Sequence, residues 1–463
     1  MKEHPKTILL VSCYEMGHQP AGLAVPIGFL ERAGYRAEAM DVSVEGFDPG
    51  RVARARFVGI SVPMHTALRL GLRVAEQVRR INPDCHICFY GLYASLNEDY
   101  LLDHAADSVI GGEYEEALVK LVESLDAGEP PEADGVSTRA RKAKPRLARL
   151  PFPLPVRNRL PSMDRYARLV RGGEELPAGY VEASRGCLHL CTHCPIPPVY
   201  GGRFFVVPQD VVLEDIRRLA GSGARHITFG DPDFLNGPLH SLRLARAMHE
   251  EFPEITFDFT AKVEHILKHR ELLPEFASLG CVFIVSAVES LSDTVLDRLE
   301  KGHTRSDIGE ALRVLRGAGI ALRPSFVSFT PWTSMDDYLD VMEFVEAEGL
   351  IDNVDPVQYT IRLLIPPGSL LLERADTERW LGRLIHESFS YEWAHPDPFM
   401  DELHGRVSRL VEESVSRKED PSATFYRIRD LARGGRGDGR APLRPALPPD
   451  RLRPPRLSEA WFC

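Results

Sequence analysis

The sequence has few cysteines and no long hydrophobic run. Eight cysteines among 463 residues are too few for a disulfide scaffold, so we expect reduced core residues, nucleophiles or metal ligands. No apolar stretch approaches the ~18 residues of a membrane span, and the N-terminal run Ile8–Cys13 is too short for the core of a signal peptide. We therefore expect a cytoplasmic protein that does not associate with membranes.

The sequence also lacks an excess of basic residues. Its 56 Lys and Arg residues are outnumbered by 67 Asp and Glu residues, which gives a formal net charge of −11. Because proteins that bind nucleic acids usually carry a basic surface, this balance argues against a nucleic acid as the main partner. With 44% hydrophobic residues, the chain can form two or three globular domains with their own cores.

The first part of the chain alternates short apolar runs with amphipathic stretches such as Leu68–Arg80. The apolar runs predict five strands: Thr7–Cys13, Ala37–Val42, Phe57–Val62, His86–Tyr90 and Ser108–Ile110. This alternation predicts an α/β fold with a doubly wound parallel sheet of the Rossmann or flavodoxin type over residues 1–126. In such sheets, ligands bind beyond the carboxyl ends of the strands.

A second α/β unit is expected after a proline-rich linker at residues 127–177. Residues 178–375 contain six predicted strands with intervening helices, which favour a partial (β/α)6 barrel with catalytic groups at the strand carboxyl ends. The strands are Tyr180–Ala183, His226–Phe229, Thr256–Thr260, Cys281–Val285, Ala321–Phe326 and Val357–Leu364. Residues 376–432 predict a small helical appendage. Residues 433–463 are rich in Arg, Pro and Gly and predict a flexible tail that ends in Cys463.

Three cysteines stand close together after the first strand of this second unit. Cys187, Cys191 and Cys194 have the spacing C-x3-C-x2-C. Three such thiolates can ligate three irons of a cubane cluster and leave the fourth iron free to bind a substrate. A zinc site would usually draw on a second ligand pair ~12 to 20 residues away, which is missing here. The remaining alternative is a zinc knuckle completed by His189 or His193.

This spacing and its place after a strand resemble the radical S-adenosylmethionine (SAM) superfamily over about residues 178–370. The resemblance implies a [4Fe-4S] cluster on the three cysteines, whose free iron is chelated by SAM and whose electron cleaves a C–S bond of SAM homolytically. It also implies a SAM pocket formed by His193, Gly230, Asp231, Asp233, Ser286, Glu289, Arg323, Ser325 and Ile365. For Glu289 the alternative is an exposed acid at a helix N-terminus.

Residues 5–125 resemble the cobalamin (B12)-binding domain that precedes many radical SAM barrels. The resemblance rests on Gly59-Ile-Ser61-Val, Asn82-Pro83, Tyr90-Gly91 and Val109-Ile-Gly111-Gly112-Glu113. It implies cobalamin contacts at strand ends from Ser61, Val62, Gly91, Leu92, Gly111, Gly112 and Glu113. The Asp-x-His-x-x-Gly signature of an axial histidine is absent, so we expect cobalamin to bind base-off without a protein histidine. His18 is the alternative ligand, although its spacing does not match that signature.

The sequence finishes with Trp461-Phe462-Cys463 after the tail. This segment resembles the CUAEP/CCAEP tails of one radical SAM subfamily, in which U is selenocysteine, and the C-terminal cysteines of the radical SAM enzyme of arsinothricin biosynthesis. We expect Cys463 to be a catalytic thiol, and a UGA codon after it would encode selenocysteine in such a tail. The alternative is an accidental thiol.

The resemblances imply an enzyme that uses a [4Fe-4S] cluster, SAM and cobalamin, with a small-molecule substrate and a one-electron reductant such as flavodoxin or ferredoxin. The leading hypothesis is methylation or alkylation of an unreactive centre. The second hypothesis is transfer of the 3-amino-3-carboxypropyl group of SAM to arsenic or another soft atom. The third, of a different class, is a non-catalytic corrinoid- or metal-binding module.

Overall fold

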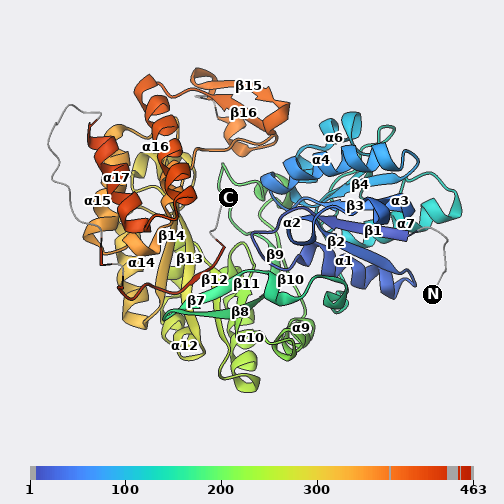
Figure 1. Cartoon of the computed structure of the whole chain (residues 1–463), viewed down its shortest axis with the longest axis horizontal. Coiled ribbons are helices and arrows are strands. Elements are labelled where there is room, and N and C mark those ends of the chain that lie inside the picture. Colours follow the sequence, from blue (N-terminus) through green and yellow to red (C-terminus); the bar gives the residue numbers. More distant parts are fainter. Residues whose placement is uncertain (1–6, 375–376, 435–446, 449, 460–463) are drawn as a thin grey trace.

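The computed structural model of the chain describes residues 7–374, 377–434, 447–448 and 450–459. They form an N-terminal α/β domain, a curled α/β half-barrel and a C-terminal segment that lies beside the half-barrel (Figure 1). None of the described helices is long and apolar enough to cross a bilayer.

The N-terminal domain is a doubly wound sheet, as predicted. Its strand order is β2-β1-β3-β4-β5-β6, with parallel pairing through β5. In β1, Leu9 and Val11 pack in one hydrophobic cluster, whereas Ile8 and Leu10 pack in another, because both faces are covered by helices. The strands are β1 Thr7–Ser12, β2 Ala37–Asp41, β3 Ala55–Ser61, β4 His86–Tyr90, β5 Ser108–Ile110 and β6 Val136–Ser137. The helices are α1 Ala21–Arg32, α2 Val42–Glu45, α3 Pro49–Arg54, α4 His65–Ile81, α5 Leu92–Leu96, α6 Glu98–His104 and α7 Glu115–Ala127.

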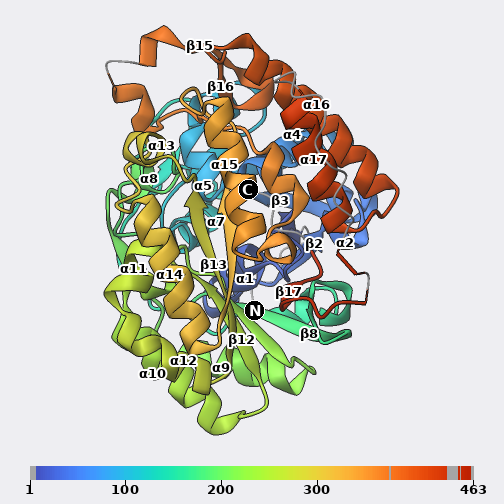
Figure 2. The same ribbon diagram turned by 90° about the vertical axis from the view of Figure 1, so that its left-hand side faces the viewer.

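The half-barrel is built on a seven-stranded sheet in the order β14-β13-β12-β11-β8-β7-β17. In this sheet, the five strands β8, β11, β12, β13 and β14 are parallel, whereas β7 and β17 are antiparallel additions at one edge. Helices cover the outer face, and their apolar sides form the main hydrophobic cluster (Figure 2). The strands are β7 Arg168–Arg171, β8 Glu174–Val181, β11 His226–Phe229, β12 Thr256–Thr260, β13 Cys281–Glu289, β14 Ala321–Phe326 and β17 Arg456–Leu457. The helices are α9 Gln209–Gly221, α10 Pro238–Glu251, α11 Val263–Lys268, α12 Leu273–Ser278, α13 Asp293–Arg298, α14 Arg305–Ala318 and α15 Met335–Ala347.

The expected sixth strand, Val357–Leu364, is not a strand. Pro356–Thr360 forms a 3-10 helix, in which the side-chain oxygen of Gln358 accepts the N–H of Phe326 on β14 at 3.0 Å. Further on, an isolated bridge pairs Arg362 with Phe329. Pro356 starts this turn because its fixed φ suits a helical start and it has no N–H to give to a ladder. The parallel part of the half-barrel therefore has five strands.

The C-terminal appendage is only partly helical. Helices α16 Pro398–Ser416 and α17 Pro421–Gly434 were expected, but Leu381–Ile385 (β15) and Ser390–Trp393 (β16) form an antiparallel hairpin. The Trp393 indole N–H donates to the Leu363 carbonyl at 2.8 Å. This hairpin thus binds the segment where a sixth strand was expected.

The linker and the described part of the tail are both packed against the half-barrel. The linker contains β6, β7 and the first half of β8, and Phe152 belongs to the main hydrophobic cluster. In the tail, Arg451 forms ion pairs with Asp352 and Asp420, and β17 pairs with β7. Ion pairs and backbone hydrogen bonds hold residues 450–459 in place. Because these interactions do not require apolar residues, the composition of the segment did not reveal that it packs on the half-barrel.

Candidate active site

The three cysteines lie on one loop near the carboxyl end of β8. The loop follows β9 (Ser184–Gly186), which pairs with β10 (Phe204–Val206). Gly186 has a φ of 75°, and a Cβ there would lie 2.4 Å from the Arg203 carbonyl oxygen, so the turn into the loop requires glycine. Cys187 and Cys191 are 9% and 6% exposed, and Cys194 is half-buried.

Neighbouring segments hold the cysteine loop in place. Thr192 donates its N–H to the Leu299 carbonyl at 3.1 Å, and the Ser369 hydroxyl donates to the Thr192 carbonyl at 3.0 Å. At the start of the loop, the Leu188 N–H donates to the side-chain oxygen of Asn236 at 3.3 Å. The loop is thus bound to segments that follow three different strands of the half-barrel.

Burial opposes the ionisation of two of the three loop thiols. Burial raises the pKa of Cys187, and it raises the pKa of Cys194 to about 12, with a further increase from the neighbouring thiols. His193 contacts Glu289 and His189 contacts His265, so both histidines that could complete a zinc knuckle have other partners. Three buried thiols on one loop fit a [4Fe-4S] cluster with one iron free of protein ligands.

A charged triad lies next to the loop. The Nε2 atom of His193 and the Nζ atom of Lys301 are 3.3 and 3.2 Å from the same oxygen of Glu289. Burial alone would raise the pKa of Glu289, but Lys301 and His193 lower it to about 2, so this carboxylate stays ionised. Glu289 also has a φ of 66°, a strained conformation for a non-glycine residue at the end of β13.

Asp231 and Asp233, at the end of β11, are bonded within the protein. Asp231 accepts hydrogen bonds from the Ala183 N–H and from Ser184, and burial raises its pKa to about 7. Asp233 is 1% exposed and accepts the Lys262 N–H at 3.2 Å. Asp231 thus links the end of β11 to the segment that follows β8, and Asp233 links it to the segment that follows β12.

Gly230 precedes these acids and packs against Tyr180. A Cβ at position 230 would lie 2.0 Å from the Tyr180 hydroxyl oxygen. Glycine is therefore required for the tyrosine ring to lie over this strand end.

The other residues that were expected to bind SAM are spread over β13, β14 and the segment after the 3-10 helix. Ser286 is fully buried, Ser325 is 5% exposed, and Arg323 donates to Asp355 at 3.0 Å. Arg323 and Ser325 lie on the β14 face opposite to the one that packs against the helices. Ile365 is fully buried and its backbone bonds to the hairpin β15–β16.

Two buried polar atoms at the loop have no hydrogen-bond partner among the described residues: His193 Nδ1, and Asn236 Nδ2, whose side-chain oxygen accepts the Leu188 N–H. Ser286 Oγ on β13 and Arg323 Nη1 on β14 are also buried and unpartnered. Because buried polar atoms are nearly always satisfied, these four atoms are candidates for contact with a polar ligand. The free donors fit a molecule such as SAM, with its carboxylate and ribose hydroxyls.

In the N-terminal domain, the expected cobalamin residues lie at the carboxyl edge of the sheet. Ser61 ends β3, Val62 follows it, and Leu92 begins α5. Gly91 has a φ of 107°, and a Cβ there would lie 3.3 Å from the Val62 carbonyl oxygen. These residues supply one hydroxyl and backbone groups, and His18 stacks on Tyr180 of the half-barrel at 4.6 Å. Backbone groups and a hydroxyl of this kind can bind the polar edge of a corrin.

The glycines after β5 make close contacts with the protein. A Cβ at Gly111 would lie 2.6 Å from the Ser95 side chain, and one at Gly112 would lie 2.4 Å from the Arg146 carbonyl oxygen. Glu113 is fully buried and accepts the Tyr200 hydroxyl at 2.9 Å. Tyr200 ends α8 (Pro197–Tyr200), directly after the cysteine loop.

Arg185 crosses the boundary between the two domains. Its guanidinium pairs with Glu113 and Glu115 of the N-terminal domain and with Glu182 of the half-barrel. The side chains of both N-terminal glutamates are fully buried. Burial raises the pKa of Glu113 to about 7, although Arg185 lowers it.

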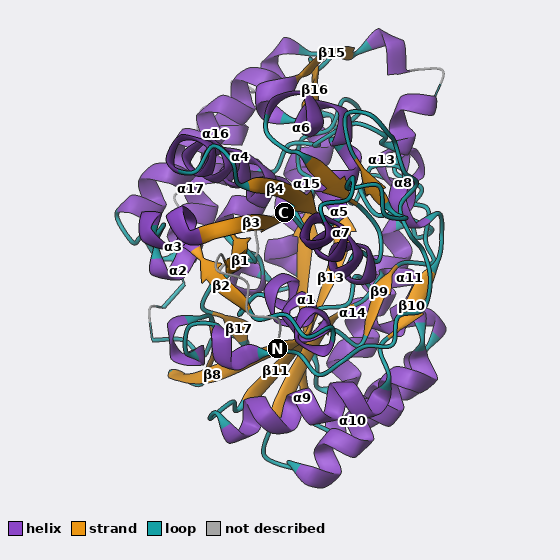
Figure 3. Ribbon diagram, turned by 90° about the vertical axis from the view of Figure 1, so that its right-hand side faces the viewer, coloured by secondary structure: helices purple, strands orange, loops and turns teal. Residues whose placement is uncertain are grey.

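The carboxyl edges of the two sheets face each other. The loop after β1 contacts the half-barrel through His18, and the loop after β5 contacts it through Glu113. Helix α5 contacts α8. Figure 3 shows the molecule from the side of the N-terminal domain. Where α4 meets the hairpin β15–β16, the His65 Nε2 contacts the Ser388 carbonyl oxygen at 2.5 Å. The expected cobalamin edge and the cysteine loop thus share one interface.

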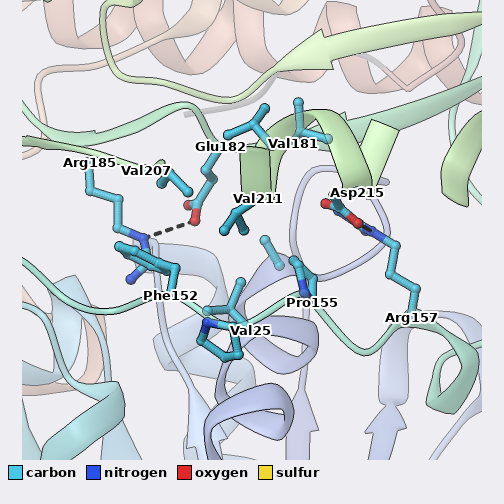
Figure 4. Close-up of a pocket in the computed structure, with 13 residues that line it drawn as sticks. Val25, Phe152, Pro155, Arg157, Val181, Glu182, Arg185, Val207, Val211 and Asp215 are labelled. Atoms are coloured by element: carbon cyan, nitrogen blue, oxygen red, sulfur yellow. Dashed lines mark hydrogen bonds and ion pairs between the residues drawn. The ribbon is translucent and has the colours of Figure 1, made fainter. Parts of the chain in front are cut away.

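A small cavity lies at another part of this boundary, between α1, the linker and α9 (Figure 4). Apolar side chains such as Val25 and Phe152 line it, and the ion pairs Arg185–Glu182 and Arg157–Asp215 flank it. Its volume of about 20 Å³ holds a single water molecule. It is therefore a packing gap and not a substrate site.

Sequence reasoning missed Lys301, Arg185 and Tyr180 as parts of the site. Arg185 stands two residues before the first of the three cysteines, but its partners in the N-terminal domain, Glu113 and Glu115, lie about 70 residues away in the chain. Lys301 follows a short helix in an unremarkable sequence, so only the fold places it beside Glu289. Cys463 lies outside the described residues.

Family models match both domains. The B12 binding domain model matches residues 7–122, and the Radical SAM superfamily model matches residues 181–345. The first match lies within the N-terminal domain, and the second runs from the end of β8 into α15 of the half-barrel.

Curated relatives with similar sequences include two kinds of enzyme. The hopanoid C-3 methylase of Methylococcus capsulatus is 25% identical over 339 residues, which cover 71% of this chain and 64% of the relative. The tRNA-2-methylthio-N(6)-dimethylallyladenosine synthase of Shewanella denitrificans is 26% identical, and 56% of each chain is covered. The chain thus spans less than two thirds of the length of these relatives.

Solved structures show the same fold at low identity. The cobalamin-dependent SAM radical enzyme OxsB, with aqua-cobalamin and SAM bound, has a TM-score of 0.69 and 17% identity, covering 89% of this chain and 67% of its own. The radical SAM methyltransferase TsrM from Kitasatospora setae has a TM-score of 0.63 and 17% identity, covering 80% of this chain and 75% of its own. At 89% and 80% of this chain, both alignments extend beyond either domain alone.

Proposed function

From the premise that this chain is a radical SAM enzyme with a B12-binding domain, we propose that it transfers a methyl or other alkyl group to an unreactive centre of a small molecule. The observation that carries this proposal is the shared interface between the cysteine loop and the carboxyl edge of the N-terminal sheet. A substrate between them would reach both cofactors.

The residues present fit the cofactors that the two domains imply. Cys187, Cys191 and Cys194 would hold a [4Fe-4S] cluster, and the unpartnered polar atoms nearby would receive SAM. The carboxyl edge from Ser61 to Glu113 would receive cobalamin. When bound, the cluster and SAM supply one-electron cleavage of a C–S bond, and cobalamin supplies a methyl carrier.

The protein's own residues would position SAM. Glu289 is ionised and fixed by Lys301, so it can accept a hydrogen bond from an ammonium group or a ribose hydroxyl. The free Nδ1 of His193 adds a polar contact next to the third cysteine. Burial of this triad keeps water away from the reacting atoms.

The partners follow from this chemistry. A radical SAM enzyme needs an external electron donor, and we propose a one-electron reductant such as flavodoxin or ferredoxin. The negative net charge favours a small-molecule substrate over a nucleic acid, although one relative is named for a product in tRNA. A cytoplasmic location would supply the donor.

Product analysis tests the proposed function. The protein is reconstituted anaerobically with iron, sulfide and hydroxocobalamin, reduced, and incubated with SAM. We expect 5′-deoxyadenosine and S-adenosylhomocysteine, because radical formation and methyl transfer each consume SAM. Cys194→Ala should abolish both products, whereas Cys88→Ala, which removes a buried thiol of β4, should not. A full cluster without SAM cleavage would refute the proposal.

Transfer of the 3-amino-3-carboxypropyl group to arsenic or another soft atom is the second candidate. It is supported by the path of the tail: the Tyr14 hydroxyl donates to Glu459 at 3.3 Å, and the Glu459 side chain packs against Gly17. The last described residue thus lies beside the loop after β1, and Cys463 is four positions further along. A thiol delivered there could hold a soft metalloid.

The second candidate has its own test. Methylthioadenosine in place of 5′-deoxyadenosine would favour carboxypropyl transfer, because the two products come from different C–S cleavages. Cys463→Ser should then leave the iron content and SAM binding unchanged and abolish turnover. Unchanged turnover would assign no role to this thiol.

A further inference from the structure

Two histidines and one aspartate converge beside the cysteine loop. His189 lies on the loop itself, Asp233 follows β11, and His265 belongs to α11, which follows β12. Their side chains are 14%, 1% and 6% exposed. Three segments from different parts of the half-barrel therefore meet at one buried point.

The distances between the three side chains are those of a metal site. The Asp233 Oδ2 is 2.9 Å from the His265 Nδ1 and 3.7 Å from the His189 Nε2, and the two nitrogens are 3.5 Å apart. A triangle with these sides has a circumscribed radius of about 2.0 Å, close to the bond lengths of about 2.0–2.2 Å that zinc forms with nitrogen and oxygen. A cation slightly out of this plane would bond all three atoms without any movement of the protein.

Hydrogen bonding alone does not account for this arrangement. Within the triangle, only the Asp233–His265 distance is that of an ordinary hydrogen bond, whereas the contacts of the His189 Nε2 are longer, at 3.5 and 3.7 Å. The same Asp233 oxygen also accepts the Lys262 N–H at 3.2 Å. The three side chains thus bring one carboxylate oxygen and two imidazole nitrogens within 3.7 Å of one another.

The other nitrogen of His189, Nδ1, faces one acidic and one basic side chain. Glu264 is 3.7 Å away, so its carboxylate would have to move closer to accept the Nδ1 proton when Nε2 is a ligand. Lys262 is 3.1 Å from the same Nδ1, and its charge is balanced by Glu264 at 3.2 Å. The ammonium weakens cation binding at this point, and this provides one of the tests.

We propose that His189, Asp233 and His265 bind one divalent metal ion, and that this site clamps the cysteine loop to the ends of β11 and β12. Zinc is the expected occupant, because two imidazoles and one carboxylate at near-tetrahedral spacing match its preferred donors and geometry. The site does not depend on cobalamin, SAM or the proposed reaction. It is distinct from the zinc knuckle considered above, because it uses none of the cysteines.

Zinc content and the zinc absorption edge test the proposal. The full-length protein with a complete cluster is incubated with zinc and passed through a desalting column. We expect one retained zinc, with nitrogen and oxygen neighbours at about 2.0–2.1 Å and imidazole scattering. Zinc in the cysteine loop would show sulfur at about 2.3 Å, so the two sites are distinguishable. Failure to retain zinc, or a sulfur shell, would overturn the proposal, whereas enzymatic inactivity would not.

Matched variants assign the ligands. His265→Asn should weaken zinc binding by about 100-fold or more, because loss of an outer partner alone costs about 10–100-fold. His269→Asn is the control, since the His269 ring lies 5.7 Å from that of His265 but His269 is not one of the three proposed ligands. Lys262→Met removes the opposing ammonium and should strengthen binding several-fold. Lys262→Met keeps the test informative if the His265→Asn variant fails to assemble the iron–sulfur cluster. Equal zinc affinity in all variants would refute the site.

Discussion

Arg185→Met should loosen the contact between the two domains and make the stability of the protein more sensitive to pH. Methionine keeps a long side chain but removes the cation that faces Glu113, Glu115 and Glu182. Removal of one partner from a buried ion pair costs about 3–5 kcal/mol. We expect a loss of this size at pH 8, because at least one buried carboxylate then has no counter-charge.

The pH dependence follows from the pKa of Glu113. Burial raises this pKa from its ordinary 4.5 to about 7, and Arg185 opposes the increase. Because the folded state holds this proton more tightly than the unfolded state, Glu113 makes the free energy of unfolding fall as pH rises between about 4.5 and 7. The shift corresponds to about 3 kcal/mol. Without Arg185 the pKa rises further, so the variant continues to lose stability above pH 7.

Thermal unfolding at pH 6 and pH 8 measures this effect. The control is Arg217→Met on α9, because Arg217 is exposed and its pairs with Glu214 and Glu251 contribute less than about 1 kcal/mol. The iron content is determined for each sample, since Arg185 lies two residues before Cys187. An equal decrease of the unfolding temperature at both pH values, or one no larger than in Arg217→Met, would refute the reasoning.

The remaining predictions concern the cofactors and the tail. Reconstituted wild type should contain about four irons and absorb broadly near ~400 nm, and Cys194→Ala should lose most of both; one zinc in the cysteine loop and no iron would contradict the cluster. In His18→Ala, the paramagnetic resonance of bound Co(II) cobalamin should be unchanged, whereas loss of a nitrogen hyperfine pattern would identify His18 as a ligand. Lys301→Met should raise the dissociation constant of SAM about tenfold or more with the iron content unchanged, because Glu289 loses its ammonium partner; unchanged affinity would exclude this role. Arg451→Met should accelerate tryptic cleavage after Arg456, and an unchanged rate at this bond would show that the pairs with Asp352 and Asp420 do not hold the tail.

Local patterns predicted most of the elements and their order. The strands His86–Tyr90, Ser108–Ile110, His226–Phe229, Thr256–Thr260 and Ala321–Phe326 were predicted with the bounds that the structure has. Apolar runs between amphipathic helices specify such strands because both faces of a parallel sheet are covered. The pattern failed at Val357–Leu364, where β-branched and apolar residues indicate a strand but Pro356 begins a 3-10 helix.

The tail and the hairpin show a second limit of composition. Residues 450–459 have little apolar surface, yet Arg451 reaches Asp352, which lies 99 positions earlier in the chain. The hairpin β15–β16 is held by backbone and indole hydrogen bonds to residues 363–365. Neither the ion pair nor these hydrogen bonds has a local signal, because each depends on a partner that is distant in the sequence.

The sequence by itself determined the cysteine spacing, the two sheets and the residues at their carboxyl edges. These features are local: a C-x3-C-x2-C segment places its thiols together in any fold that ends a strand there. Only the tertiary structure decided which charges meet. It placed Lys301 beside Glu289, brought His265 to Asp233 and His189, and put Arg185 among glutamates of the other domain. Such pairs form between segments that approach when helices and strands pack, and their energies depend on burial, which a linear pattern does not contain.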